Sequence, residues 1–293
     1  MALLPPDPLF VLRSDMGHIH SLEFMFSENN ATHLLAATEE GYIYFWNLQT
    51  NKVTNKQRLG VSIQTIHYML PYIITQEKSG HVQLWHVETN FTCTLLKEYY
   101  CKGDYCRSII INSCLILPEV NSKVESVDLH TFETVTVFVP LKERLGNITA
   151  LEKANVVGKI CVLTGYESEH ITSIAFDSVI GRGVCGNSSN QLKVFTIDKE
   201  HNIKLKCEIS IKNAGCNVVR LRPDRKILAC GGWDGNLRLF SWKSLRLLVG
   251  LNQHNNSVTD VIFSGQIVPE WNSNIMSVAG GDGSISLWNL YNH

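Results

Sequence analysis

A short segment recurs along this 293-residue chain and constrains its fold more than any other feature. Each copy opens with a glycine, continues with alternating residues and ends in an aromatic side chain five positions later. Four clear copies occupy residues 41–46, 80–85, 235–240 and 283–288. Alternation with a period of two after a turn residue is typical of a β-strand. The pattern therefore predicts a repeating, all-β fold.

Other strand-like segments accompany each copy. An apolar stretch lies directly before it, as in residues 34–37 and 275–278, and another lies earlier still, as in residues 21–24 and 258–263. Two weaker copies of the segment end at Val127 and Phe195. Each repeat thus supplies at least three strands, and no segment shows sustained helical periodicity.

The distance between copies locates an irregularity. The third strand of each repeat ends at residues 46, 85, 127, 195, 240 and 288. The interval from Val127 to Phe195 is 68 residues, whereas the other intervals lie between 39 and 48. Because one repeat takes about 43 residues, this interval is too long for one repeat and too short for two. We expect seven blades, of which the one at about residues 147–168 lacks its outer pair of strands.

The ends of the sequence predict how the fold is completed. The last repeat stops soon after Trp288, and residues 9–13 form an apolar strand that belongs to no repeat. Native proteins cover or pair the exposed edges of their sheets. We therefore predict that residues 9–13 pair with the blade containing Trp288, and that they close a single domain over residues 1–293.

Composition excludes several classes of function. The chain has 26 Lys and Arg against 27 Asp and Glu, whereas nucleic-acid-binding domains usually carry a basic excess. No apolar run approaches the roughly 20 residues that span a bilayer. The amino terminus lacks the basic segment of a secretory signal, so the nine cysteines are interpreted as reduced. We expect a cytoplasmic or nuclear protein with no nucleic-acid and no membrane partner.

The repeat resembles the WD-repeat β-propeller, in which four strands form each blade and units recur every roughly 40–45 residues. The family's repeat positions fall on His18, Trp46, Trp85, Asp234, His254, Asp282 and Trp288. In that family, His, Asp, a strand Ser or Thr, and Trp form a buried hydrogen-bond network. Val278 stands at the hydroxyl position of the last blade, so we expect its network to be incomplete.

Longer segments resemble one group within that family. They are residues 5–13, 46–50, 106–108, 165–167, 176–178, 222–229, 232–234 and 286–291, in the order found in the G-protein β-subunit-like protein 1 group, called ASTRA-associated protein 1 in fungi. The chain departs from the group after Glu167, where the group continues with a third and a fourth strand. An alternative splice form or a gene-model deletion between Gly165 and His170 would account for this departure.

The resemblance implies a non-enzymatic scaffold without a cofactor. Members of the group associate with the chaperone-linked machinery that matures phosphatidylinositol-3-kinase-related kinases, so the implied partners are kinase-maturation adaptor proteins and the Hsp90 system, with chromatin-linked roles open. The alternative is a substrate receptor of a ubiquitin ligase, although the Trp-Asp-x-Arg common in such receptors is missing after Trp46, Trp85 and Trp288. No G-protein γ subunit is expected, because the closing strand near residue 9 leaves no room for the coiled-coil helix that would hold it.

Candidate binding residues concentrate in one blade. They are Arg222, Asp224, Arg225 and Lys226 in a turn, with Trp233 in the next turn and Trp271 in a long insertion. The basic turn is either a solvated turn or a docking patch for an acidic or phosphorylated segment, because arginine forks match carboxylates and phosphates. Trp233 and Trp271 either fill packing positions or serve as exposed aromatic anchors. We expect Trp233 to lie on the opposite face from the turn.

Neither a catalytic nor a metal site is expected. Residues 181–186 match the dinucleotide pattern G-x-G-x-x-G, but strand alternation follows where that site requires a helix. His18 and His20 share one face of a strand, yet no Cys-x-x-Cys or carboxylate cluster accompanies them in the sequence.

Overall fold

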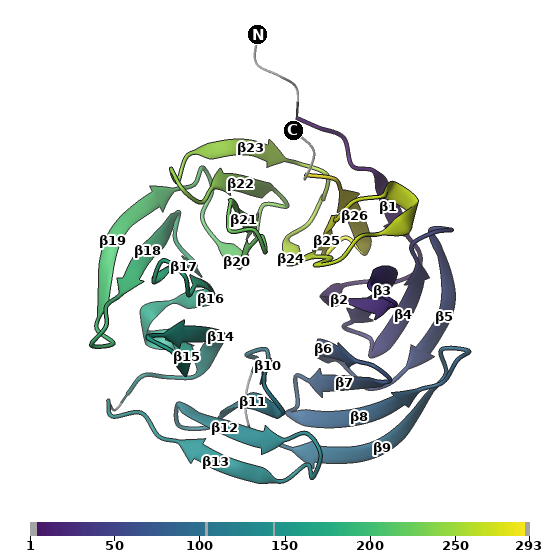
Figure 1. Cartoon of the computed structure of the whole chain (residues 1–293), viewed down its shortest axis with the longest axis horizontal. Coiled ribbons are helices and arrows are strands. Elements are labelled where there is room, and N and C mark those ends of the chain that lie inside the picture. Colours follow the sequence, from purple (N-terminus) through teal and green to yellow (C-terminus); the bar gives the residue numbers. More distant parts are fainter. Residues whose placement is uncertain (1–4, 103–104, 143, 291–293) are drawn as a thin grey trace. The chain divides into compact units, whose positions relative to one another are not determined.

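The repeated strands form seven antiparallel sheets in the computed structural model, which describes residues 5–102, 105–142 and 144–290 (Figure 1). Six of the sheets have four strands and one has two. The expected all-β class is confirmed. Neither short helix of the described residues is long and apolar enough to cross a membrane. Tyr291, which ends the last segment of the family resemblance, lies outside the described residues.

The chain separates into two compact units, which are described one at a time. The first comprises Met1–Tyr99, Asp234–Arg238 and Val249–His293, and the second comprises Tyr100–Trp233 and Leu239–Leu248. The expectation of a single domain over residues 1–293 stays a prediction.

The first unit contains three of the four-stranded sheets. One is formed by β2 (Ile19–Ser27), β3 (Asn30–Thr38), β4 (Tyr42–Asn47) and β5 (Lys52–Arg58), and the next by β6 (Ile63–Met69), β7 (Tyr72–Glu77), β8 (His81–Val87) and β9 (Cys93–Tyr100). The third is formed by β24 (Val258–Phe263), β25 (Met276–Gly280), β26 (Ser284–Trp288) and β1 (Phe10–Arg13), with the short helix η2 (Pro269–Trp271) before β25.

The second unit contains the two-stranded sheet and two complete four-stranded ones. One four-stranded sheet is formed by β10 (Ile109–Ile111), β11 (Cys114–Glu119), β12 (Lys123–Asp128) and β13 (Thr134–Phe138). The two-stranded sheet is formed by β14 (Ile148–Val156) and β15 (Lys159–Tyr166). The other four-stranded sheet is formed by β16 (Ile171–Asp177), β17 (Arg182–Asn187), β18 (Gln191–Ile197) and β19 (Ile203–Ser210). The short helix η1 (Glu167–Glu169) follows β15. A last sheet, formed by β20 (Cys216–Leu221), β21 (Ile227–Gly232), β22 (Leu237–Ser241) and β23 (Leu247–Leu251), has only its first two strands wholly in this unit.

The backbone conformation at the start of each repeated segment requires a glycine. Gly41, Gly80, Gly235 and Gly283 all have a positive φ, between 74° and 87°. Residues with a Cβ rarely adopt this conformation, which glycine adopts freely. At Gly41 a Cβ would also lie 2.0 Å from the carbonyl oxygen of Gly60. The glycine therefore sets the tight turn from which each third strand starts.

The predicted number of blades is corrected by the sheet composition. Six sheets have the four strands of a blade, so the structure contains six blades rather than seven. The remaining sheet consists of β14 and β15 alone, because the chain passes from Tyr166 through η1 directly into β16. The shortened segment thus lies where the spacing predicted it, but two strands without an outer pair do not make a blade.

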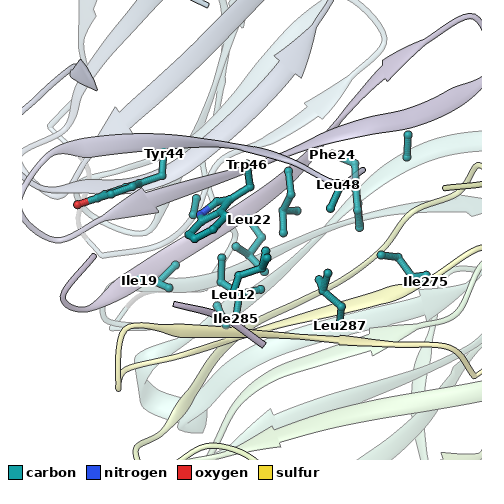
Figure 2. Close-up of a cluster of buried hydrophobic side chains, with 14 of the residues drawn as sticks. Leu12, Ile19, Leu22, Phe24, Tyr44, Trp46, Leu48, Ile275, Ile285 and Leu287 are labelled. Carbon is teal, nitrogen blue, oxygen red and sulfur yellow. The ribbon is translucent and has the colours of Figure 1, made fainter. Parts of the chain in front are cut away.

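The amino-terminal strand pairs with the last blade. Phe10 lies opposite Leu287, and Arg13 lies opposite Ser284, so β1 covers the outer edge of β26. Leu12 is fully buried and belongs to the same apolar cluster as Ile285 and Leu287 (Figure 2). Leu12 thus anchors β1 in the core of the first unit, whereas Phe10 is 43% exposed.

Candidate protein-interaction site

The repeat positions of the last blade form a complete buried polar network. His254 Nδ1 lies 3.2 Å from Asp282 Oδ1, and His254 Nε2 lies 2.9 Å from Ser286 Oγ. The indole Nε1 of Trp288 donates to the same Ser286 hydroxyl at 2.8 Å. The expectation of an incomplete network is therefore wrong. Val278 is the cross-strand neighbour of Ser286, so the hydroxyl comes from the facing position on the next strand.

The electrostatics of this network favour a neutral histidine beside an ionised aspartate. Burial lowers the pKa of His254 below its usual 6.5. Burial opposes the ionisation of Asp282, but hydrogen bonds from the Asn255 backbone and from Ser284 outweigh it and lower the pKa of that carboxyl. The members of this network bond to one another, so the network stabilises the blade.

The other repeat positions form only parts of such a network. Trp85 Nε1 donates to Thr75 Oγ1 at 3.0 Å. The buried indole nitrogen of Trp46 makes no hydrogen bond to any described residue. Asp234 binds the fork of Arg238 through both carboxylate oxygens, at 3.1 and 2.6 Å. Trp85 and Asp234 thus make these hydrogen bonds to residues of their own repeats.

The basic turn between β20 and β21 contains an ion pair between Arg222 and Asp224, which we call the Arg222–Asp224 clamp, and a separate exposed part. Arg222 is only 6% exposed. Its Nε and Nη2 donate to the two carboxylate oxygens of Asp224 at 2.9 and 2.7 Å. Asp224 also accepts the backbone N–H of Lys226 at 3.0 Å. Arg222 and Asp224 therefore hold the turn in shape, because a two-pronged ion pair fixes both side chains.

The exposed cations of this sheet come from two turns at the same end. Arg225 and Lys226 are exposed beside the clamp, and Lys243 and Arg246 are exposed in the turn between β22 and β23. The backbone N–H of Trp242 donates to the carbonyl oxygen of Lys226 at 2.8 Å, which joins the two turns. We call Arg225, Lys226, Lys243 and Arg246 the basic patch.

Apolar side chains adjoin the basic patch. Arg182, at the start of β17, stacks over the ring of Trp242 at 4.0 Å and donates to its carbonyl oxygen. The indole nitrogen of Trp242 in turn donates to Asp177 at 3.1 Å. These contacts bring the turn between β16 and β17 against Trp242, and that turn exposes Val179 and Ile180. Cations beside exposed aliphatic side chains suit a protein partner that is both acidic and apolar.

The two candidate tryptophans differ in their surroundings. Trp233 is 47% exposed, and its ring packs against Gly215, where a Cβ would lie 2.1 Å from it. It follows the end of β21, whereas the turn holding Arg225 precedes that strand, so the two lie at opposite ends, as expected. Trp271 packs against the apolar cluster around Leu12. Trp271 therefore fills a packing position, whereas Trp233 presents an exposed aromatic surface.

The glycine-rich segment of residues 181–186 belongs to the sheet. Arg182–Asn187 is strand β17, paired on both sides by β16 and β18. A Cβ on Gly183 would lie 2.3 Å from the ring of Phe195. This glycine therefore serves side-chain packing, and the backbone forms a strand where a dinucleotide site requires the start of a helix.

Comparison with known proteins supports the resemblance. A family model described as "WD domain, G-beta repeat" matches residues 205–241. The guanine nucleotide-binding protein subunit beta-like protein 1 of Mus musculus is 24% identical over 324 residues, covering 98% of this chain and 97% of the mouse protein. That alignment is longer than this chain, so the mouse protein carries residues that the chain lacks.

A fungal protein and a solved structure are also similar to this chain, and the solved structure bears on the fold alone. The ASTRA-associated protein 1 of Schizosaccharomyces pombe is 38% identical over 80 residues, which cover 27% of this chain and 20% of that protein. The crystal structure of the computationally designed protein Ika8 has a TM-score of 0.68 and 16% identity, and it covers 97% of this chain and 100% of its own. The chain thus has an all-β WD-repeat propeller fold, and the resemblance to the β-subunit-like and ASTRA-associated group is confirmed.

Proposed function

We propose that this protein is a non-enzymatic scaffold, and that its partners are adaptor proteins of the chaperone-linked machinery that matures phosphatidylinositol-3-kinase-related kinases. The names of the ASTRA-associated relatives support membership of an assembly. The kinase-maturation role rests on the family resemblance of the sequence. The proposal places the protein in the cytoplasm or the nucleus and includes the Hsp90 system among its indirect partners.

The observation that carries the proposal is the basic patch. Its four cations are exposed on turns whose backbone is fixed by the Arg222–Asp224 clamp and by the Trp242–Lys226 hydrogen bond. Rigid presentation lowers the entropy lost when a partner binds. With Val179 and Ile180 beside it, the patch fits an acidic segment that also carries apolar side chains.

The proposal includes the completion of the propeller by its first strand. Residues 9–13 would close a single domain over residues 1–293, with the sheet of β14 and β15 in the place of the shortened repeat. The pairing of β1 with β26 supports this part of the proposal.

Affinity purification from the native cells, followed by mass spectrometry, tests the function. We expect kinase-maturation adaptors to be recovered with the tagged protein. Recovery of cullins and their adaptors alone would overturn the proposal in favour of a ubiquitin-ligase substrate receptor.

A further inference from the structure

Two histidines and a glutamate gather at one end of the sheet formed by β2 to β5. His18 directly precedes β2, His20 is the second residue of that strand, and Glu39 directly follows β3. One ligand atom from each lies within 4.8 Å of the others. The sequence pattern gave the two histidines but not the carboxylate, which is supplied by the neighbouring strand.

The backbone fixes this arrangement. The N–H of Glu39 donates to the carbonyl oxygen of His18 at 2.9 Å, which ties the end of β3 to the start of β2. The pairing passes from Ile19 opposite Thr38 to Ser21 opposite Ala37, so His20 occupies a β-bulge. Bulges redirect side chains and are frequent beside functional sites.

The same bulge recurs at the start of β6, β14, β16, β20 and β24. The residues at those bulges are Gln64, Thr149, Thr172, Asn217 and Thr259. A polar residue therefore occupies each of these six bulges of the described strands, but only the bulge in β2 has a histidine.

The side chains of the two histidines and the glutamate lie close together, and Lys78 holds the glutamate in place. Lys78 Nζ binds Glu39 Oε1 at 3.0 Å, and this contact, followed by weaker attraction to His20 and His18, lowers the pKa of the Glu39 carboxyl. The other oxygen, Oε2, lies 3.8 Å from His18 Nδ1, which makes no hydrogen bond within the described part of the chain. The two imidazole rings meet edge to face at 4.7 Å. Gly281 leaves room for the His18 ring, because a Cβ there would lie 2.8 Å from it.

We propose that His18, His20 and Glu39 bind a divalent transition-metal ion, with zinc as the expected metal. Two imidazole nitrogens and a carboxylate oxygen form a donor set that suits zinc, cobalt and nickel better than magnesium or calcium. Bonds of about 2.0–2.1 Å place tetrahedral ligands roughly 3.4 Å apart, so the three side chains must close around the ion. The side chains of His18 and Glu39 are 33% and 53% exposed and have room to move. A tetrahedral ion would take its fourth ligand from water or from a side chain of a partner.

Cobalt titration of the metal-stripped full chain tests the site, because Co²⁺ reports its ligands in its absorption spectrum. We expect one Co²⁺ to bind with the visible bands of a tetrahedral nitrogen and oxygen site, and zinc to displace it. His18→Ala, His20→Ala and Glu39→Gln should each weaken cobalt binding by at least about tenfold. Loss of a direct ligand lowers metal affinity more than loss of an outer-shell contact, which typically costs about 10–100-fold.

The control is a matched histidine and carboxylate elsewhere in the same unit. His86 Nδ1 and Glu88 Oε1 lie 3.2 Å apart, and the two side chains are 34% and 49% exposed, so His86→Ala should leave cobalt affinity unchanged. Circular dichroism without metal checks that each variant is folded. The proposal is overturned if folded His20→Ala binds cobalt as the wild type does, if no visible bands develop, or if the bands show thiolate ligands from the nine free cysteines.

Discussion

The hydroxyl of Ser286 connects two buried nitrogen atoms of the last blade. It lies 2.9 Å from His254 Nε2 and accepts the indole N–H of Trp288 at 2.8 Å. Replacing Ser286 with alanine leaves both groups buried without this partner, at an expected cost of about 1–3 kcal/mol in the free energy of unfolding. Urea unfolding measures this loss.

Ser244→Ala is the control for this substitution, because Ser244 is exposed in the turn between β22 and β23. Its stability should stay close to that of the wild type. Adding Val278→Thr to Ser286→Ala should recover part of the lost stability, since the two positions face each other across β25 and β26. Equal stability of Ser286→Ala and Ser244→Ala would contradict the network.

The neutral state of His254 makes stability depend on pH. Because burial lowers its pKa below 6.5, the unfolded chain takes up this proton before the folded chain does as the pH falls. The contribution is therefore fully present above about pH 6.5 and decreases at lower pH. Urea unfolding should show that the free energy of unfolding falls less from pH 7.5 to pH 5.5 in His254→Gln than in the wild type. An identical fall in the two proteins would refute the assignment.

The hydroxyl position illustrates what the sequence can and cannot supply at single residues. The histidine, aspartate and tryptophan of the network were identified from the repeat, since each occupies a fixed place in it. Ser286 was missed because a hydroxyl from either of two facing strand positions can reach the histidine. Only the cross-strand register, which no single segment encodes, distinguishes them.

Strand β1 is expected to stabilise the last blade strongly. It pairs with β26 over four residues, and Leu12 is fully buried. Deleting residues 1–13 exposes the edge of β26 and leaves a cavity at Leu12, so the melting temperature should fall sharply. Deleting residues 1–7, which ends before β1, is the control and should have little effect. An unchanged melt of the longer deletion would exclude a stabilising role for β1.

The sheet of β14 and β15 shows the consequence of the missing strands. All six residues of β17, the second strand of a complete sheet, are buried, whereas most of β15 is half-buried or exposed. The spacing of the repeats predicted a shortened unit at about residues 147–168 that lacks its outer pair of strands. The bulges at the start of the first strands were not predicted, because they arise from pairing between strands.

The surface of the protein combines a near-zero net charge with a local concentration of cations. Lys and Arg number 26 against 27 Asp and Glu, yet two neighbouring turns expose Arg225, Lys226, Lys243 and Arg246. The sequence identified the basic turn but not the different tasks of its arginines. Arg222 and Arg225 are three positions apart in the sequence. Only the fold shows that the guanidinium of Arg222 donates two hydrogen bonds to Asp224.

Charge reversal in the basic patch tests the central claim most directly. The variant Arg225→Glu/Lys226→Glu/Lys243→Glu changes exposed side chains and leaves the Arg222–Asp224 clamp intact, so it should melt as the wild type does. It should lose most of the kinase-maturation adaptors recovered by affinity purification, because an acidic partner segment would be repelled. Lys212→Glu, an exposed change at the other end of β20, should retain them. Undiminished adaptor recovery with the folded triple variant would contradict the account.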